Sequence, residues 1–102
     1  MKGGGKYKKG RRIERELRMM LECENYYVMR SAGSKGIFDL IAIPTLNLDK
    51  KILLIQSKCN KMPPKEELDI LNDFKCPLTC EKRLYIYMDR VGFKYILMEN
   101  NG

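Results

Sequence analysis

Apolar residues recur with a helical period near the start of the chain and with a strand period after it. Four of them are spaced as one face of an amphipathic helix of about four turns, namely Ile13, Leu17, Met20 and Leu21. This spacing predicts a helix over residues 12 to 24, and Asn25 suits the end of such a helix. The next residues, YYVMR at 26 to 30, favour β structure and predict a strand.

Two more strands are predicted in the middle of the chain. FDLIAIP, at residues 38 to 44, is a short apolar run that Pro44 ends, and it holds one acid close to its start. ILLIQSK, at residues 52 to 58, is apolar and β-branched enough for a central strand. Alternation places Gln56 and Lys58 on one face and Ile55 and Ser57 on the other. An amide and an ammonium two residues apart in such a run point to a role beyond packing.

The remaining pattern predicts a second helix and a final pair of strands. Pro63 and Pro64 open the helix KEELDILNDF, Pro77 stops it, and its apolar side holds Leu68, Ile70, Leu71 and Phe74. RLYIYMD and FKYILM then flank a short turn at Val91-Gly92. The predicted order is α-β-β-β-α-β-β, an α/β fold with a mixed central sheet flanked by helices. At 102 residues the chain is expected to form one domain.

Charged residues are distributed unevenly along the chain. The net charge is +7, and six of the basic residues precede the first acid, while residues 13–102 carry 14 basic and 13 acidic residues. We therefore expect a flexible basic arm over residues 1–10, followed by the domain over residues 11–102. Such an arm attracts phosphate by salt-sensitive electrostatics and favours nucleic acid, and the alternative is a solubilising tail. No apolar run approaches the roughly 20 residues that span a bilayer, and no secretion signal is apparent, so a cytoplasmic location is expected.

The types of side chain present limit the reactions that this protein could catalyse. There is no histidine, so hydrolysis would depend on carboxylates, lysine and a hard metal ion. The four cysteines, Cys23, Cys59, Cys76 and Cys80, are expected to be reduced thiols, because their spacing is poor for zinc and no secretory signal favours disulfides.

Three charged residues are candidates for such chemistry. Asp39 offers an oxygen ligand to Mg²⁺, Lys58 can orient or activate water near a phosphate, and Glu14 lies beside the apolar stripe of the first helix. Glu16 flanks that stripe from the other side and is not excluded. Each has an ordinary alternative, because Asp39 can cap a turn, Lys58 can extend its ammonium to solvent from a strand end, and Glu14 can pair with Arg18.

Residues 10 to 58 combine these candidates in a longer pattern. It has a basic start, an E-R-E-L helix, R-S-A-G-S after a strand, an aspartate a few residues later and a strand that closes in Q-S-K. This order resembles the archaeal Holliday junction resolvases, which belong to the restriction-endonuclease-like nucleases. The resemblance implies the restriction-endonuclease-like core, and its sequence signal is weaker in the last helix and strands.

The resemblance also implies a role for each matching position. Glu14 would be the helix acid, Asp39 a metal ligand, Lys58 the catalytic lysine, and Ser34 would lie near the scissile strand. The cation would be Mg²⁺, with Mn²⁺ as a substitute, held by Glu14, Asp39, Gln56 and the backbone carbonyl of Ser57. The basic side chains expected to contact DNA are Lys6, Lys8, Lys9, Arg11, Arg12, Arg15, Arg30 and Lys35.

Position 56 departs from the family pattern, which has glutamate where this chain has Gln56. An amide oxygen still coordinates Mg²⁺, but it brings no negative charge, so the attraction for the ion falls. The favoured hypothesis is a metal-dependent endonuclease that cuts branched DNA as a homodimer. One alternative is a non-catalytic relative that only binds DNA. Another is a small basic RNA-binding protein whose tyrosines stack on bases, namely Tyr26, Tyr27, Tyr85 and Tyr87.

Overall fold

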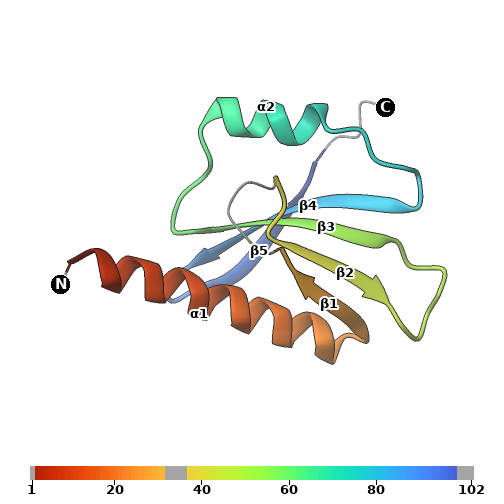
Figure 1. Ribbon diagram of the computed structural model, residues 1–102, viewed down its shortest axis with the longest axis horizontal. Coiled ribbons are helices and arrows are strands. Elements are labelled where there is room, and N and C mark those ends of the chain that lie inside the picture. Colours follow the sequence, from red (N-terminus) through yellow and green to blue (C-terminus); the bar gives the residue numbers. More distant parts are fainter. Residues whose placement is uncertain (1, 32–36, 99–102) are drawn as a thin grey trace.

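The computed structural model describes residues 2–31 and 37–98, with side chains from Lys9 onward. Its elements follow the predicted order α-β-β-β-α-β-β (Figure 1), with bounds α1 Lys2–Cys23, β1 Tyr26–Arg30, β2 Leu40–Pro44, β3 Ile52–Cys59, α2 Lys65–Asp73, β4 Cys80–Met88 and β5 Gly92–Leu97. The predicted mixed sheet flanked by helices is confirmed. No helix in the described part of the chain is long and apolar enough to cross a bilayer.

Helix α1 is longer than predicted. It begins at Lys2 rather than at residue 12, so residues 2–10 have helical backbone in place of the expected flexible arm. Lysine and arginine are good helix formers and no proline interrupts the segment, which lets the helix extend back through glycines that weaken it. The predicted end is confirmed, since α1 stops at Cys23 and Asn25 has a positive φ of 71° that turns the chain into β1.

A single mixed sheet of five strands forms the centre of the molecule, in the order β1-β2-β3-β4-β5. All neighbouring strands are antiparallel except β3 and β4, which are parallel. Because parallel neighbours need a crossover, α2 connects β3 to β4 and lies on the opposite face of the sheet from α1 (Figure 1). The two helices therefore cover the two faces of β3, the strand that carries Gln56 and Lys58.

The main core lies between α1 and the sheet. Ile13, Leu17 and Leu21 are buried, and Met20 packs against the same core, which confirms the apolar stripe predicted for this helix. Leu53 and Ile55 are buried from the β3 side, as the alternation predicted. Burial of this kind contributes about 1.5–3 kcal/mol for each large aliphatic side chain, so α1 is held firmly against β3.

Helix α2 buries less than its sequence suggested. Of its predicted apolar side, only Leu71 is buried, whereas Ile70 is 52% and Phe74 38% exposed. Leu68 is partly buried, and Phe74 packs edge-on against Phe38 with ring centroids 5.1 Å apart. A buried lysine of β4 adds to its anchoring: the Lys82 ammonium donates hydrogen bonds to the carbonyls of Leu71, Asn72 and Phe74 at 2.7, 3.0 and 2.6 Å.

Replacing Lys82 by Met should destabilise the fold. Lys82 is 1% exposed and satisfies carbonyl groups at the end of α2 that have no partner within the helix. Since hydrogen bonds to a charged donor contribute about 1.5–3 kcal/mol each when removed singly, we expect the free energy of unfolding to fall by about 2–3 kcal/mol. Urea denaturation measures this change. Lys75→Met, at an exposed position after α2, is the control and should change stability by less than about 0.5 kcal/mol. Equal stability of the two variants would contradict the role given to Lys82.

Candidate active site

Asp39 lies where β2 and β3 separate. Strand β2 begins at Leu40, two residues later than predicted, and the register that pairs Leu40 with Ile55 places Asp39 opposite Gln56. The Asp39 backbone N–H donates to the Ile55 carbonyl at 2.7 Å, which adds one more ladder bond. Beyond it, the Asp39 carboxylate accepts a hydrogen bond from the Ser57 backbone N–H at 2.8 Å. The Asp39 side chain thus takes the place of a backbone carbonyl as the acceptor of the next hydrogen bond from β3.

This position changes the acidity of Asp39. Burial, which disfavours the charged form, raises the pKa of Asp39 above its ordinary value, and the Ser57 hydrogen bond and the charges of Lys58 and Arg30 only partly offset that rise. A half-buried carboxylate with a raised pKa, directed into a groove, is typical of a functional site.

The raised pKa predicts a stability change for Asp39→Asn. In the folded chain Asp39 holds its proton more tightly than in the unfolded chain, so its contribution to stability is present below pH 3.8 and is lost as the pH rises through the folded pKa. At pH 7 the ionised side chain therefore opposes folding, whereas asparagine keeps the acceptor for Ser57 without the charge. We expect a higher melting temperature for Asp39→Asn than for the wild type at pH 7, and a smaller gap as the pH falls.

Thermal denaturation in buffers from pH 7 down to pH 4 measures this effect. Asp49→Asn, in the exposed turn before β3, is the matched control and should leave the melting temperature unchanged. A lower melting temperature for Asp39→Asn at pH 7 would show that the ionised carboxylate stabilises the fold.

Strand β3 presents three consecutive polar residues at the same place. Ile55 faces the core under α1, and Gln56 faces the other side, where it lines a cavity with Leu71 of α2. The Ser57 N–H points toward Asp39, and the Ser57 carbonyl points to the same side of the strand, where the ladder with β2 has ended. Lys58 extends toward α2, where its ammonium lies 3.0 Å from Glu67. The predicted alternation along β3 is therefore confirmed.

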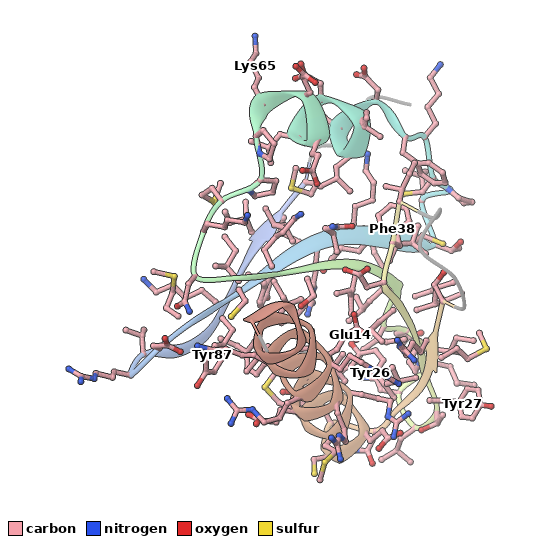
Figure 2. All side chains as sticks on the ribbon, turned by 60° about the vertical axis from the view of Figure 1, so that its left-hand side comes forward. Glu14, Tyr26, Tyr27, Phe38, Lys65 and Tyr87 are labelled. Carbon is pink, nitrogen blue, oxygen red and sulfur yellow. The ribbon has the colours of Figure 1, made fainter. Side chains whose placement is uncertain are left out.

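Glu14 approaches from α1. Its Oε1 accepts a hydrogen bond from the Arg30 Nε at 2.9 Å, so Glu14 pairs with β1 and not with Arg18. Figure 2 shows Glu14 between α1 and the strands β2 and β3. The Glu14 side chain is 22% exposed. This ion pair joins Glu14, the predicted helix acid, to Arg30, a predicted phosphate contact.

One hollow of about 440 Å³ brings these side chains together. We call it the central groove, and the residues lining it include Glu14, Arg30, Asp39, Gln56, Ser57 and Lys58. They come from α1, β1, the start of β2, and β3, so residues more than 40 positions apart in the sequence meet in one place. Glu14, Asp39 and Lys58, which were expected to converge, all line this hollow.

The donors in the central groove suit a hard cation. The Asp39 carboxylate, the Gln56 amide oxygen and the Ser57 carbonyl are oxygen donors of the kind that Mg²⁺ and Mn²⁺ bind. Within residues 2–31 and 37–98, no three histidine, cysteine, aspartate or glutamate side chains gather as a metal-binding group. A cation here would consequently depend on the amide and the carbonyl beside the carboxylates.

A second hollow of about 550 Å³ adjoins the central groove and shares Arg11, Glu14 and Arg30 with it. We call it the arginine groove, and it is lined by Arg11, Arg12, Glu14, Arg15, Arg18, Arg30 and Leu40. Arginine side chains form hydrogen-bonded forks that match phosphate oxygens. The arginine groove therefore provides a positively charged path that leads to Asp39 and Lys58.

The other predicted site residues are placed less centrally. Lys9 forms an ion pair with Asp89 at 3.1 Å, which attaches α1 to the end of β4. Glu16 pairs with Arg12 at 3.6 Å on the surface of α1 and does not line the central groove. Ser34 and Lys35, and the side chains of Lys6 and Lys8, lie outside the described part of the chain.

Three residues at the site were missed by the sequence analysis. Arg18 lines the arginine groove, Lys61 lines the central groove, and Glu67 contacts Lys58. The signal for Arg18 was present, because Arg11, Arg15 and Arg18 share one face of a helix by their spacing. Nothing in the local pattern around Lys61 or Glu67 indicates the contact across the fold.

The tyrosines do not form the base-stacking surface considered from the sequence. Tyr26 is 8% and Tyr85 3% exposed, and both belong to the core under α1. Tyr87 packs edge-on against Phe93 with ring centroids 5.2 Å apart. Of the four, only Tyr27 is largely exposed, so the observation that suggested RNA stacking is better explained by sheet packing.

Comparison with known proteins agrees with this geometry. The family model described as archaeal Holliday junction resolvase (Hjc) matches residues 5–99. A 37-residue segment is 62% identical to the crossover junction endodeoxyribonuclease Hjc of Methanocaldococcus jannaschii, and it spans 36% of this chain and 27% of that protein. The fold is similar to the solved structure of Hjc from Archaeoglobus fulgidus, with a TM-score of 0.66 and 22% identity over 87% of this chain and 72% of the other. With nearly its whole length matched by the family model, the chain belongs to the archaeal Holliday junction resolvase family.

Proposed function

We propose that this protein is a metal-dependent endonuclease that hydrolyses phosphodiester bonds in branched DNA. The observation that carries the proposal is the meeting of Glu14, Asp39, Gln56 and Lys58 in one groove that continues into a path lined by arginines. Membership of the resolvase family supports the choice of substrate class. Action on chromosomal or viral DNA would place the protein in the cytoplasm.

In this proposal each residue has a separate task. Asp39, Gln56, the Ser57 carbonyl and Glu14 would hold Mg²⁺, or Mn²⁺ in its place, and the bound cation would supply charge stabilisation and an activated water. Lys58 places an ammonium beside the scissile phosphate, where it stabilises the negative charge that develops on the phosphate oxygens. Arg15 and Arg30 hold the flanking phosphates and fix the register of the strand.

The working unit would be a homodimer. Resolution of a four-way junction requires two nicks placed symmetrically, and two copies related by a two-fold axis supply two central grooves in that arrangement. Light scattering on the purified protein, alone and with a junction, measures the number of copies, and a single copy on each junction would contradict a dimer.

A cleavage panel tests the function. With Mg²⁺ or Mn²⁺, the protein should nick a four-way junction in preference to a linear duplex of the same sequence, and products should be absent when the cation is chelated. A second candidate is a DNA-binding relative without activity, which the uncharged Gln56 favours because it lowers the attraction for a cation. Tight junction binding with no cleavage in either cation would select that candidate.

A further inference from the structure

Glu67 of α2 lies next to the proposed site. Its Oε1 is 3.0 Å from the ammonium of Lys58, and the Lys58 side chain is only 21% exposed. Glu67 is in the first turn of α2, one turn after Pro64, whose carbonyl accepts a hydrogen bond from the Glu67 N–H at 3.0 Å. The backbone of α2 therefore fixes a carboxylate over the end of β3.

Gln56 and Glu67 also share a cavity. A hollow of about 200 Å³ under α2 is lined by Ile37, Gln56, Glu67, Ile70 and Leu71. Gln56 lines the central groove as well, so it borders both the hollow that Asp39 lines and the hollow that Glu67 lines. Glu67 is thus the carboxylate that α2 presents to the same stretch of β3 where family members carry an acid.

The balance of charge in the central groove indicates why a further carboxylate near it matters. The residues lining the groove include the acids Glu14 and Asp39, and the bases Arg11, Arg30, Lys58 and Lys61. Arg30 is bonded to Glu14, which offsets the charge of that acid. The groove therefore holds more basic than acidic side chains, and the Lys58 ammonium, only two residues from Gln56, adds directly to the repulsion of a divalent cation.

We propose that Glu67 is a positioning residue that replaces the negative charge missing at position 56. It holds the Lys58 ammonium in place and offsets its charge, so that a divalent cation can be held by Glu14, Asp39, Gln56 and the Ser57 carbonyl. This inference rests on the proposed nuclease function. It goes beyond that function by assigning a role to a residue of α2, outside residues 10 to 58, whose order of motifs resembles the family.

An ordinary ion pair between Lys58 and Glu67 would have a different consequence. A partly exposed ion pair contributes little to stability, and if that were its whole role, removing Glu67 would leave the affinity for the cation unchanged. The charge-replacement role instead couples position 67 to position 56. In that case a carboxylate at position 56 or at position 67 supports cation binding. The effects of Glu67→Gln and Gln56→Glu on cation affinity are then not additive.

Mn²⁺ binding measures this coupling without depending on activity. The free Mn²⁺ signal in electron paramagnetic resonance gives the dissociation constant for the wild type, Glu67→Gln, Gln56→Glu and the double variant Gln56→Glu/Glu67→Gln. Glu66→Gln is the matched control, because it removes the same charge from the neighbouring, exposed position of α2. Melting temperatures of all variants show that each is folded, and Glu67→Ala is the second variant at this position.

We expect Glu67→Gln to weaken Mn²⁺ binding about tenfold and Glu66→Gln to change it less than about twofold. Adding Gln56→Glu to Glu67→Gln should restore binding to at least the wild-type level, and junction cleavage at low Mn²⁺ should follow the same order. Equal Mn²⁺ binding by Glu67→Gln and Glu66→Gln would overturn the inference, as would a loss that Gln56→Glu does not restore. Failure of the nuclease function itself would look different, because the wild type would then leave the junction uncut.

Discussion

Asp39→Asn should abolish junction cleavage, with a fall in the single-turnover rate of about 10³-fold or more, while junction affinity changes less than about threefold. The asparagine keeps the hydrogen bond from the Ser57 N–H and so preserves the local geometry. It removes the carboxylate that stands at the separation of β2 and β3 in the central groove. Binding survives because the contacts to DNA phosphates come from the basic residues and not from Asp39.

The stability of this variant makes the result easy to interpret. Because Asp39→Asn is expected to melt at a higher temperature than the wild type at pH 7, a loss of cleavage cannot be attributed to unfolding. Single-turnover cleavage of a labelled junction and fluorescence anisotropy with the same junction measure the two quantities. Asp49→Asn should cleave at the wild-type rate. Cleavage by Asp39→Asn within about tenfold of the wild type would exclude Asp39 from the metal-binding group.

Local sequence patterns predicted the strand positions of Asp39, Gln56 and Lys58 well. Strand alternation fixes the faces of Gln56 and Lys58 because a residue in a buried strand has only two directions available. Asp39 was predicted at the start of its strand, and the structure adds that its side chain completes the β2–β3 ladder by accepting from Ser57. The meeting of Glu14 with these residues followed from the resemblance to a family, and not from the spacing of the helix alone.

The residues that were missed depend on contacts between distant segments. Lys82 precedes the predicted strand RLYIYMD, yet the structure includes it in β4, where it is buried because the end of α2 provides three carbonyls for its ammonium. Glu67 is one of two glutamates in the first turn of the predicted second helix, where an acid suits the helix dipole, and nothing in that pattern indicates that it also reaches Lys58. Both contacts are set by how α2 crosses from β3 to β4, and neither leaves a local pattern in the sequence.

The two lysines together explain how a helix with little apolar burial can support the site. Lys58 contacts the first turn of α2 and Lys82 its last turn, so each end of the helix is joined to a strand of the parallel pair. Leu71 supplies the buried side chain between them. The position of Glu67 over β3 is consequently determined by three contacts along the helix. This arrangement predicts that Lys82→Met loosens α2 and weakens Mn²⁺ binding as well as stability.

The second large effect is expected from the arginine groove. The double variant Arg11→Gln/Arg15→Gln should weaken junction binding about 10- to 100-fold at low salt, with a similar loss for linear duplex DNA. Both side chains line the arginine groove, and Arg11 also lines the central groove, so a strand that enters the site passes them. Each phosphate contact releases about one condensed cation from the DNA, so the slope of log affinity against log salt should fall by about two.

Anisotropy titrations between about 50 and 200 mM salt measure this slope. The matched control is Lys75→Gln/Lys94→Gln, which removes the same total charge from exposed positions after α2 and on β5. If general attraction by the net charge of +7 governed binding, both double variants would lose affinity and slope alike. If the DNA follows the arginine groove, the control keeps nearly the full slope while Arg11→Gln/Arg15→Gln loses about two units of it. Since a junction and a linear duplex both present phosphates to the arginine groove, the ratio of junction to duplex affinity should change much less than either affinity alone.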